Sequence, residues 1–136
     1  MLNIAITAGG TSETIDGVRK LTNVSTGRLG WQCLEAVLQY LSASADSDFH
    51  VYYIHTETAF RSELADEAKQ KVEFITVTDA ASVYASVDDL TKSVDITHFI
   101  HSMAISDFTY SYGIGIGLTL KAVIRQTPRY RQRNHC

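Results

Sequence analysis

The sequence predicts an α/β fold in which a mainly parallel sheet is covered by helices on both faces. Short runs rich in β-branched and aromatic residues alternate along the chain with stretches of helical periodicity. The 136 residues suit one compact domain, and 45% of them are apolar, which is enough for an ordinary core. A single proline and the lack of biased segments give no sign of a linker or a repeat. Alternating strands and helices of this kind build parallel sheets.

The first half of the chain contains two predicted strands on either side of one helix. Residues 2–7 form a short apolar run that ends at two glycines, and residues 50–55 form a second β-rich run. From Gly27 onward, apolar residues recur at the i, i+3, i+4 and i+7 positions of a helix. These residues are Leu34, Val37, Leu38 and Leu41. Such spacing gives a helix with one buried stripe.

The second half continues the alternation. Residues 57–71 are polar enough for a short exposed helix or a loop, and residues 72–77 are the third predicted strand. Asp79 is an N-cap candidate for a second helix. One face of that helix consists of Ala80, Val83, Tyr84 and Val87. Residues 95–101 and 118–124 are the fourth and fifth predicted strands, so the whole pattern predicts a Rossmann-like, doubly wound sheet.

Composition and charge exclude several classes of protein. The net charge is −3, and the basic segment 121–136 carries no known nucleic-acid-binding motif, so no nucleic-acid partner is expected. No apolar run approaches the ~20 residues that span a bilayer, so no membrane association is expected. The start of the chain lacks the basic region of a signal peptide, and Cys33 and Cys136 fit reduced thiols. These features predict a cytoplasmic protein.

Two loops are predicted to share one rim of the sheet, because parallel sheets bind ligands at the carboxyl ends of their strands. Gly9 and Gly10 end the first strand, where backbone N–H groups can face an anion, and Thr11 adds a hydroxyl. A second cluster directly precedes the long helix and consists of Asn23, Ser25, Thr26 and Gly27. Helix N-terminal amides and the helix dipole suit a phosphate. Each cluster alone fits a tight turn or a cap, whereas the two together favour a nucleotide or phosphate site.

The segment after the fourth predicted strand, residues 101–107, falls on the same rim. Asp107 is its most informative charge, since a carboxylate there could hold a metal ion, accept a ribose hydroxyl or cap the next element. The chain has no P-loop, no dinucleotide fingerprint after the first strand and no Tyr-x-x-x-Lys pair. Four histidines lack partners at metal-ligand spacing, so no metal site is predicted. They are His50, His55, His98 and His101.

Two ordered stretches of the sequence match a known pattern. Residues 7–30 contain TAGGTSE, ID, VR, TN and STG in that order, and residues 101–108 read HSMAISDF. Both resemble the phosphopantothenoylcysteine synthetase family, the phosphopantothenate–cysteine ligases, which read TAGGTxExID-VR-ITNxSSGxMG and HxMAVSDY there. The resemblance covers about residues 2–112. It is to the stand-alone bacterial type, without the flavin-dependent decarboxylase that is fused to it in many bacteria.

The resemblance implies a two-step ligase of coenzyme A biosynthesis. Members of the family join 4′-phosphopantothenate to cysteine with a nucleoside triphosphate, which is usually CTP in bacteria, with ATP as the other candidate. The nucleotide activates the pantothenate carboxylate as an acyl-nucleotidylate and releases pyrophosphate. The cysteine amine then attacks this mixed anhydride. Mg²⁺ accompanies the nucleotide, and a homodimer is expected because members of the family are dimers.

The resemblance also implies roles for individual positions. Asn23 would hold the acyl-nucleotidylate and Asp107 would contact the nucleotide, so these two are the expected catalytic residues. Gly9, Gly10 and Thr11 would lie against nucleotide phosphate. The remaining expected nucleotide-binding residues are Ser25, Thr26, Gly27, His101, Ser102 and Met103, the last three through their backbone.

The sequence departs from the family near its end. Relatives carry a lysine-containing segment shortly after the aspartate, whereas residues 110–117 here read YSYGIGIG. Residues 118–121 and the pair Thr127 and Pro128 resemble a later family strand and turn, as in a truncated member.

These departures set the domain division and the alternatives. Residues 1–112 are expected to form a synthetase-like nucleotide-binding domain, and residues 113–136 a divergent C-terminal segment of the same domain. One alternative is a catalytically incomplete remnant that binds nucleotide or phosphopantothenate. Another is a Rossmann-like oxidoreductase module, against which the missing fingerprint argues.

Overall fold

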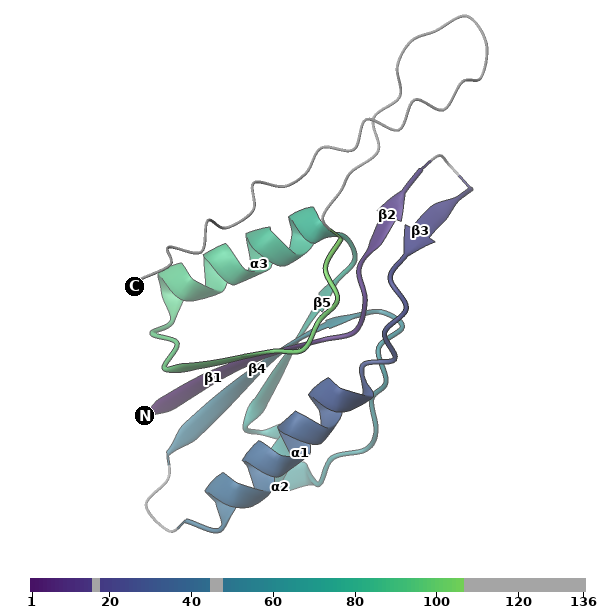
Figure 1. The fold of residues 1–136 in the computed structure, drawn as a ribbon. Coiled ribbons are helices and arrows are strands. Elements are labelled where there is room, and N and C mark those ends of the chain that lie inside the picture. Colours follow the sequence, from purple (N-terminus) through teal and green to yellow (C-terminus); the bar gives the residue numbers. More distant parts are fainter. Residues whose placement is uncertain (16–17, 45–47, 107–136) are drawn as a thin grey trace, which may run out of the picture.

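The computed structural model describes residues 1–15, 18–44 and 48–106. Its elements are, in chain order, β1 (Leu2–Ala8), β2 (Ser12–Thr14), β3 (Lys20–Thr22), α1 (Arg28–Ser42), β4 (Phe49–Thr56), α2 (Asp66–Lys69), β5 (Val72–Val77), α3 (Ala80–Ser93) and β6 (His98–His101). Four strands form a parallel sheet in the order β5-β4-β1-β6, while β2 and β3 form a separate antiparallel hairpin. The predicted α/β class is therefore confirmed (Figure 1).

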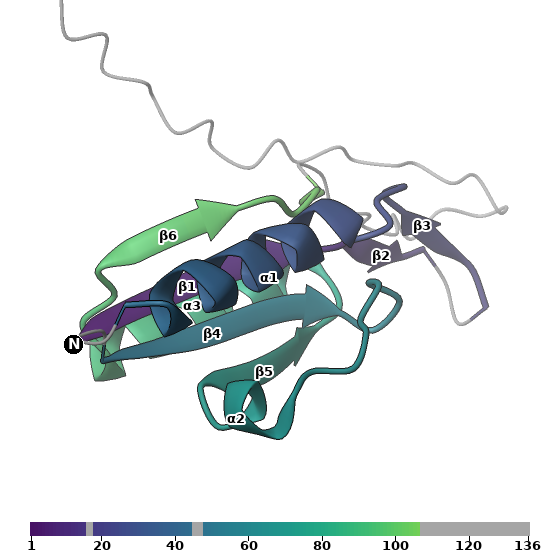
Figure 2. The same cartoon turned by 90° about the horizontal axis from the view of Figure 1, so that it is seen from below.

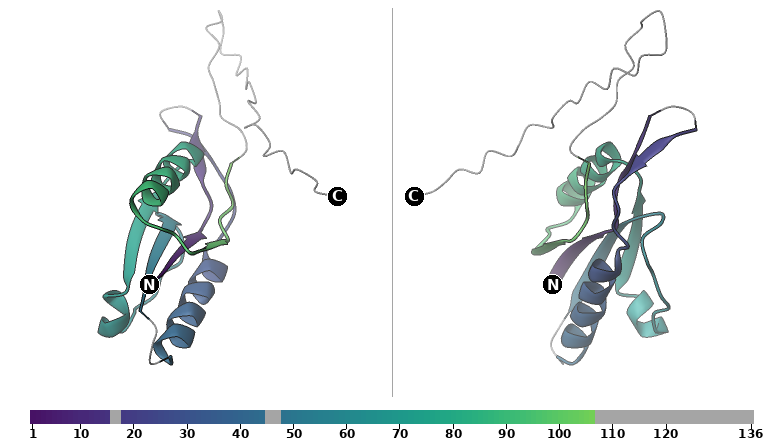
Figure 3. Two further views of the ribbon diagram at one scale, coloured as in Figure 1. Left: turned by 90° about the vertical axis from the view of Figure 1, so that its left-hand side faces the viewer. Right: turned by 45° about the vertical axis from the view of Figure 1, so that its right-hand side comes forward.

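Helices cover both faces of the sheet, as predicted. Side chains alternate along β1, so that Ile4 and Ile6 belong to the core under α1 while Ala5 belongs to the core under α3. Figures 2 and 3 show α1 and α3 on opposite sides of the strands. The strand order runs outward from β1 to β5 and then returns to β6 on the other side of β1. The switch point, where sheets of this kind bind ligands, therefore lies between β1 and β6.

Helix α1 follows the predicted apolar stripe. Its buried residues are Gly30, Trp31, Leu34, Leu38 and Leu41. The ring of Trp31 packs edge-on against Tyr53, with ring centroids 5.7 Å apart, and stacks on Phe74, with ring centroids 6.4 Å apart. Replacing a fully buried leucine such as Leu34 by alanine typically costs about 2–5 kcal/mol. The stripe therefore holds α1 firmly on the sheet.

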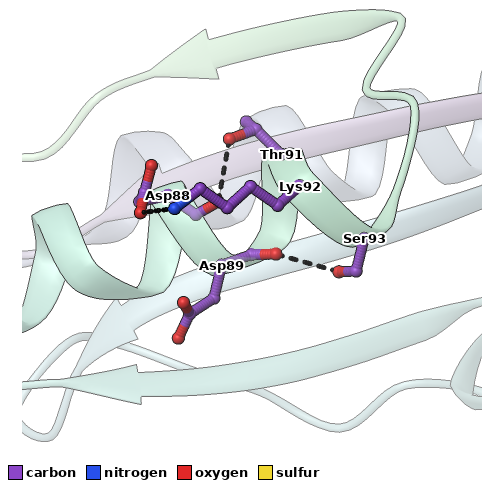
Figure 4. Close-up of polar contacts among 5 residues, drawn as sticks. All are labelled: Asp88, Asp89, Thr91, Lys92 and Ser93. Carbon is purple, nitrogen blue, oxygen red and sulfur yellow. Dashed lines mark hydrogen bonds and ion pairs between the residues drawn. The ribbon is translucent and has the colours of Figure 1, made fainter.

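Helix α3 begins at the predicted cap. Asp79 and Ser82 form a capping box in which Asp79 Oδ1 accepts the Ser82 amide at 2.8 Å. Tyr84, which shares the predicted apolar face, is 54% exposed because it lies at the border of that face. Near the far end of the helix an exposed ion pair joins Lys92 and Asp88 at 2.8 Å (Figure 4).

The β2–β3 hairpin was not predicted. It pairs Ser12 with Thr22 and Thr14 with Lys20, and it extends beyond the end of β1 (Figure 1). Its polar side chains show no alternation of apolar and polar residues, which is the usual signal for a strand. The dipeptide Asp-Gly at 16–17, which is typical of hairpin turns, was the available signal.

Other boundaries differ less from the prediction. The polar segment 57–71 contains the short helix α2, one of the two predicted options. The fourth predicted strand, 95–101, is shorter in the structure because β6 covers only His98–His101. The predicted strand 118–124 and the boundary after residue 112 lie outside the described residues. In the described part of the chain, no helix is both long and apolar enough to cross a membrane.

Candidate functional site

The predicted loops after β1 and β6 meet at the carboxyl ends of these neighbouring strands, where Thr7 joins them. The buried Thr7 hydroxyl shares a hydrogen bond with His101 Nδ1 at 2.7 Å. The Thr7 carbonyl accepts the Ser102 hydroxyl at 2.6 Å, and the Ser102 N–H lies 3.2 Å from the Thr7 carbonyl and hydroxyl oxygens. Two sequence-predicted residues, His101 and Ser102, are therefore fixed at the switch point.

Close contacts within the chain explain why positions 9 and 10 are occupied by glycine. Gly9 has a φ of 98°, and a Cβ added there would lie 2.2 Å from Thr56 Oγ1. A Cβ at Gly10 would lie 2.3 Å from the carbonyl oxygen of Asn23. The Ala104 N–H also donates to the Gly9 carbonyl at 2.9 Å. The two glycines thus let Thr56, Asn23 and Ala104, which come from three different segments, approach the end of β1. The contact of the glycine amides with phosphate stays a prediction.

One polar residue from each of three rim loops forms what we call the Thr11–Asn23–Ser106 cluster. The Ser106 N–H donates to Thr11 Oγ1 at 2.8 Å, and the two hydroxyls share a hydrogen bond at 3.0 Å. Asn23 Nδ2 donates to Ser106 Oγ at 2.9 Å and lies 3.4 Å from the hydroxyl and carbonyl oxygens of Thr11. The cluster brings together the predicted residues Thr11 and Asn23. It adds Ser106, which was not predicted as a site residue although it lies in the stretch HSMAISDF.

The N-cap residue of α1 provides no side-chain cap, and the only hydrogen bond that the described residues show from a side chain to its first amide is a long one, from Arg28 N–H to Thr26 Oγ1 at 3.4 Å. Its N-cap, Gly27, has a φ of 78°, and the first turn contains no acidic residue. A Cβ at Gly27 would lie 2.9 Å from the Cβ of Ala59, so the helix start packs against the loop after β4. The Thr26 carbonyl accepts the Phe60 N–H of the same loop at 2.8 Å. Because first-turn amides lack acceptors within the helix, this end has a positive potential that suits a phosphate.

Two further contacts fix and charge the start of α1. A Cβ at Gly30 would lie 2.3 Å from the Cβ of Ala8 and 2.8 Å from Ser102 Oγ, so the helix rests directly on β1 and on the rim. The guanidinium carbon of Arg28 lies 4.4 Å from the ring centroid of Phe60. This cation–π contact keeps a permanent positive charge at the helix start. Arg28 was not predicted as a site residue, because its position over Phe60 depends on the fold.

The remaining predicted residues differ in how they can reach a ligand. Ser25 is half-buried and donates its N–H to the Asn23 carbonyl at 3.1 Å. The Met103 side chain is buried in the core under α3, so its backbone alone can border the rim. Asp107 lies outside the described residues. Among the described residues, no group of three or more His, Cys, Asp or Glu side chains is placed to hold a metal ion.

Glu13 anchors the base of the hairpin to α3. Its buried carboxylate accepts the Ala80 N–H at 3.0 Å, and the neighbouring Ser12 N–H donates to the Thr78 carbonyl at 2.9 Å. A carboxylate is favourable at a helix N-terminus because it meets the positive end of the dipole. The glutamate of the TAGGTSE stretch therefore has a structural role, because it holds the hairpin to the start of α3.

Two buried titratable groups on β4 have shifted pKa values. Burial, with a smaller effect of Cys33, raises the pKa of Tyr53 to about 12. Burial also lowers the pKa of His55 below its ordinary value of 6.5. The Thr56 carbonyl, which accepts the Nδ1 proton at 2.9 Å, offsets part of this shift. The two rings stack with centroids 5.8 Å apart, so His55 packs against the core under α1, to which Tyr53 belongs.

Comparison with known proteins identifies relatives of the chain. The family model described as the DNA/pantothenate metabolism flavoprotein C-terminal domain matches residues 1–113. The chain is 36% identical over 107 residues to the coenzyme A biosynthesis bifunctional protein CoaBC of Bacillus subtilis (strain 168). This match covers 79% of the present chain and 23% of CoaBC. The crystal structure of the DNA/pantothenate metabolism flavoprotein from Streptococcus pneumoniae matches with a TM-score of 0.70 and 27% identity, over 95% of this chain and 62% of that chain.

Two further solved structures have the same fold. The C-terminal domain of the coenzyme A biosynthesis bifunctional protein CoaBC matches with a TM-score of 0.62 and 27% identity, over 82% of this chain and 49% of that chain. A mutant of Cab2 in complex with phosphopantothenate-cysteine matches with a TM-score of 0.63 and 18% identity, over 82% of this chain and 47% of that chain. The chain thus spans only part of the length of these relatives.

These matches confirm the resemblance to the phosphopantothenoylcysteine synthetases. The chain belongs to the family of the DNA/pantothenate metabolism flavoprotein C-terminal domain, which is the phosphopantothenate–cysteine ligase domain of coenzyme A biosynthesis.

Proposed function

We propose that the chain is a phosphopantothenate–cysteine ligase, which activates 4′-phosphopantothenate with CTP or ATP as an acyl-nucleotidylate that cysteine then attacks. The observation that carries the proposal is the Thr11–Asn23–Ser106 cluster, which joins the two family-like stretches of sequence at one rim. Family membership supports the same activity, because CoaBC is by name a protein of coenzyme A biosynthesis.

The rim offers what a nucleoside triphosphate needs. The start of α1, which has a glycine N-cap and no acidic residue in its first turn, and the guanidinium of Arg28 supply positive potential for the phosphates. Gly9, Gly10 and residues 25–27 would lie against the phosphates, and the backbone of residues 101–103 would border the nucleotide. Donors that are already in place stabilise developing charge without reorganisation.

Asn23 and Asp107 would contact the reacting species. Asn23 would hold the acyl-nucleotidylate through its carboxamide, and Asp107, which lies outside the described residues, would contact the nucleotide. Both steps need reacting atoms about 3 Å apart, so a residue that fixes the intermediate contributes by positioning.

Mg²⁺ would neutralise phosphate charge when it is bound together with the nucleotide. Within the described rim, no carboxylate cluster offers a site for the ion, and Glu13 is engaged with α3. The described residues therefore do not form a magnesium site of their own. A homodimer and a cytoplasmic location complete the proposal.

Mass spectrometry of a reaction with 4′-phosphopantothenate, cysteine, Mg²⁺ and CTP or ATP tests the proposal. The wild-type chain should form phosphopantothenoylcysteine, and Asn23→Ala should lower the rate about 100-fold, as the loss of a preorganised polar contact does. Ser93→Ala is the matched control, because it removes a hydroxyl on α3 that donates to the Asp89 carbonyl at 2.9 Å (Figure 4). No product with either nucleotide would overturn the proposal.

A second candidate is a domain that binds nucleotide or phosphopantothenate without turnover. The stretch YSYGIGIG favours it, because the family carries a lysine in that region. Isothermal titration separates the two candidates. Heat on binding CTP, ATP or phosphopantothenate without any product identifies the binding domain, and no heat with any of them contradicts both.

A further inference from the structure

We propose that Ser106 and Thr11 are positioning residues that fix the carboxamide of Asn23. They hold its nitrogen, Nδ2, within the protein, and its oxygen, Oδ1, then faces the substrate. This inference rests on the proposed function, because it concerns how Asn23 would meet the reaction intermediate. It gives a role to Ser106, which the expected site residues do not include.

The first argument is the kind of acceptor around Nδ2. The nitrogen lies 2.9 Å from Ser106 Oγ and 3.4 Å from both the hydroxyl and the carbonyl oxygen of Thr11. A carbonyl oxygen accepts hydrogen bonds and never donates one, so the carboxamide nitrogen must face it. A carboxamide turned by 180° would bring Oδ1 against that carbonyl, with two acceptors in contact. The Thr11 carbonyl therefore disfavours the flipped orientation.

The second argument is that Ser106 Oγ can accept from Asn23 whichever way the hydroxyl protons point. The Ser106 and Thr11 hydroxyls lie 3.0 Å apart, and either can donate to the other. Thr11 Oγ1 also lies 3.4 Å from the Ala104 carbonyl and accepts the Ser106 N–H at 2.8 Å. A serine oxygen can accept two hydrogen bonds. Ser106 Oγ therefore has a lone pair for Asn23 Nδ2, 2.9 Å away, in both arrangements.

The third argument is burial. Thr11 is 0% exposed and Ser106 is 3% exposed, so water does not compete with their hydrogen bonds, whereas Asn23 is half-buried. Gly10 lies against the same side chain, since a Cβ there would be 3.2 Å from Asn23 Cβ. A planar carboxamide whose nitrogen is held on one side presents its oxygen on the other. Such a preset acceptor can receive an N–H or O–H of the intermediate without first reorienting.

Amide exchange by NMR tests the orientation without any need for activity. The side-chain NH₂ signals of Asn23, assigned by their loss in Asn23→Asp, should exchange with solvent about tenfold faster in Ser106→Ala than in the wild type. Thr11→Val should act in the same way, and Thr11→Ser should preserve slow exchange because it keeps the hydroxyl. Ser93→Ala should leave the signals unchanged. Equal exchange in wild type, Ser106→Ala and Thr11→Val would overturn the proposal.

A double-mutant cycle on the ligase reaction tests the positioning role. Ser106→Ala should lower kcat about tenfold with little change in KM, and it should have no further effect in the Asn23→Ala background. The same fall in both backgrounds would show that Ser106 does not act through Asn23, and would overturn the role. An inactive wild type would overturn the proposed function instead, and the exchange rates would still decide the orientation of the carboxamide.

Discussion

The close contact between Gly30 of α1 and Ala8 of β1 leads to a specific prediction, because a single added methyl group would disrupt it. A Cβ at Gly30 would lie 2.3 Å from the Cβ of Ala8, far inside the ordinary contact range of 3.4–4 Å. Gly30→Ala must therefore push α1 away from β1, although alanine favours a helix over glycine by about 1 kcal/mol. Overpacking a filled interface costs about 1–3 kcal/mol. With a second close contact to Ser102 Oγ at 2.8 Å, we expect a net loss of about 1–2 kcal/mol.

Ala8→Gly is the matched second substitution. Alone it should cost about 1 kcal/mol, since it removes a buried methyl and places glycine in a strand. The double variant moves the methyl from β1 to α1, so the two changes should couple favourably by about 1–2 kcal/mol. Urea midpoints at a constant m-value measure all four proteins. Additive losses, or a Gly30→Ala variant as stable as the wild type, would refute the close contact.

Three further predictions concern single side chains. Burial lowers the pKa of His55 below 6.5 and so favours its neutral form in the folded chain. At pH values between that lowered pKa and 6.5, the unfolded chain therefore binds more protons than the folded chain. The free energy of unfolding should therefore fall as pH drops through this window, and it should fall less steeply in His55→Phe. Urea titrations that give the wild type and His55→Phe the same dependence of stability on pH would contradict the prediction. Glu13→Ala should lose about 1–2 kcal/mol, because the buried carboxylate accepts the Ala80 N–H at 3.0 Å. An unchanged thermal midpoint would show that α3 does not depend on that contact. Lys92→Ala should change the free energy of unfolding by less than about 0.5 kcal/mol, because its ion pair is exposed. A larger loss in urea denaturation would count against this expectation.

Elements with a regular apolar pattern could be predicted from the sequence. Leu34, Leu38 and Leu41 lie on the buried face of α1, because one stripe of apolar side chains is what holds an amphipathic helix to a sheet. The β2–β3 hairpin has no such face. Its residues 20–22 are all exposed, so no alternation of apolar and polar side chains marks the strand.

The site was predictable in outline and not in its contacts. The rule for parallel sheets placed the loops after β1 and β6 on one rim, and Thr11 and Asn23 do meet there. The close neighbours of Gly9 and Gly10 depend on how the loops fold over one another, which periodicity does not encode. Ser106 was missed for the same reason, because its partner Asn23 lies 83 positions earlier in the chain.

The most direct test of the central claim, that this rim activates phosphopantothenate, is pyrophosphate release in the absence of cysteine. The reaction contains the chain, Mg²⁺, 4′-phosphopantothenate and CTP or ATP. We predict release that depends on phosphopantothenate, together with the mass of an acyl-nucleotidylate that becomes phosphopantothenoylcysteine when cysteine is added. No phosphopantothenate-dependent release with either nucleotide, from protein that circular dichroism shows to be folded, would contradict the claim.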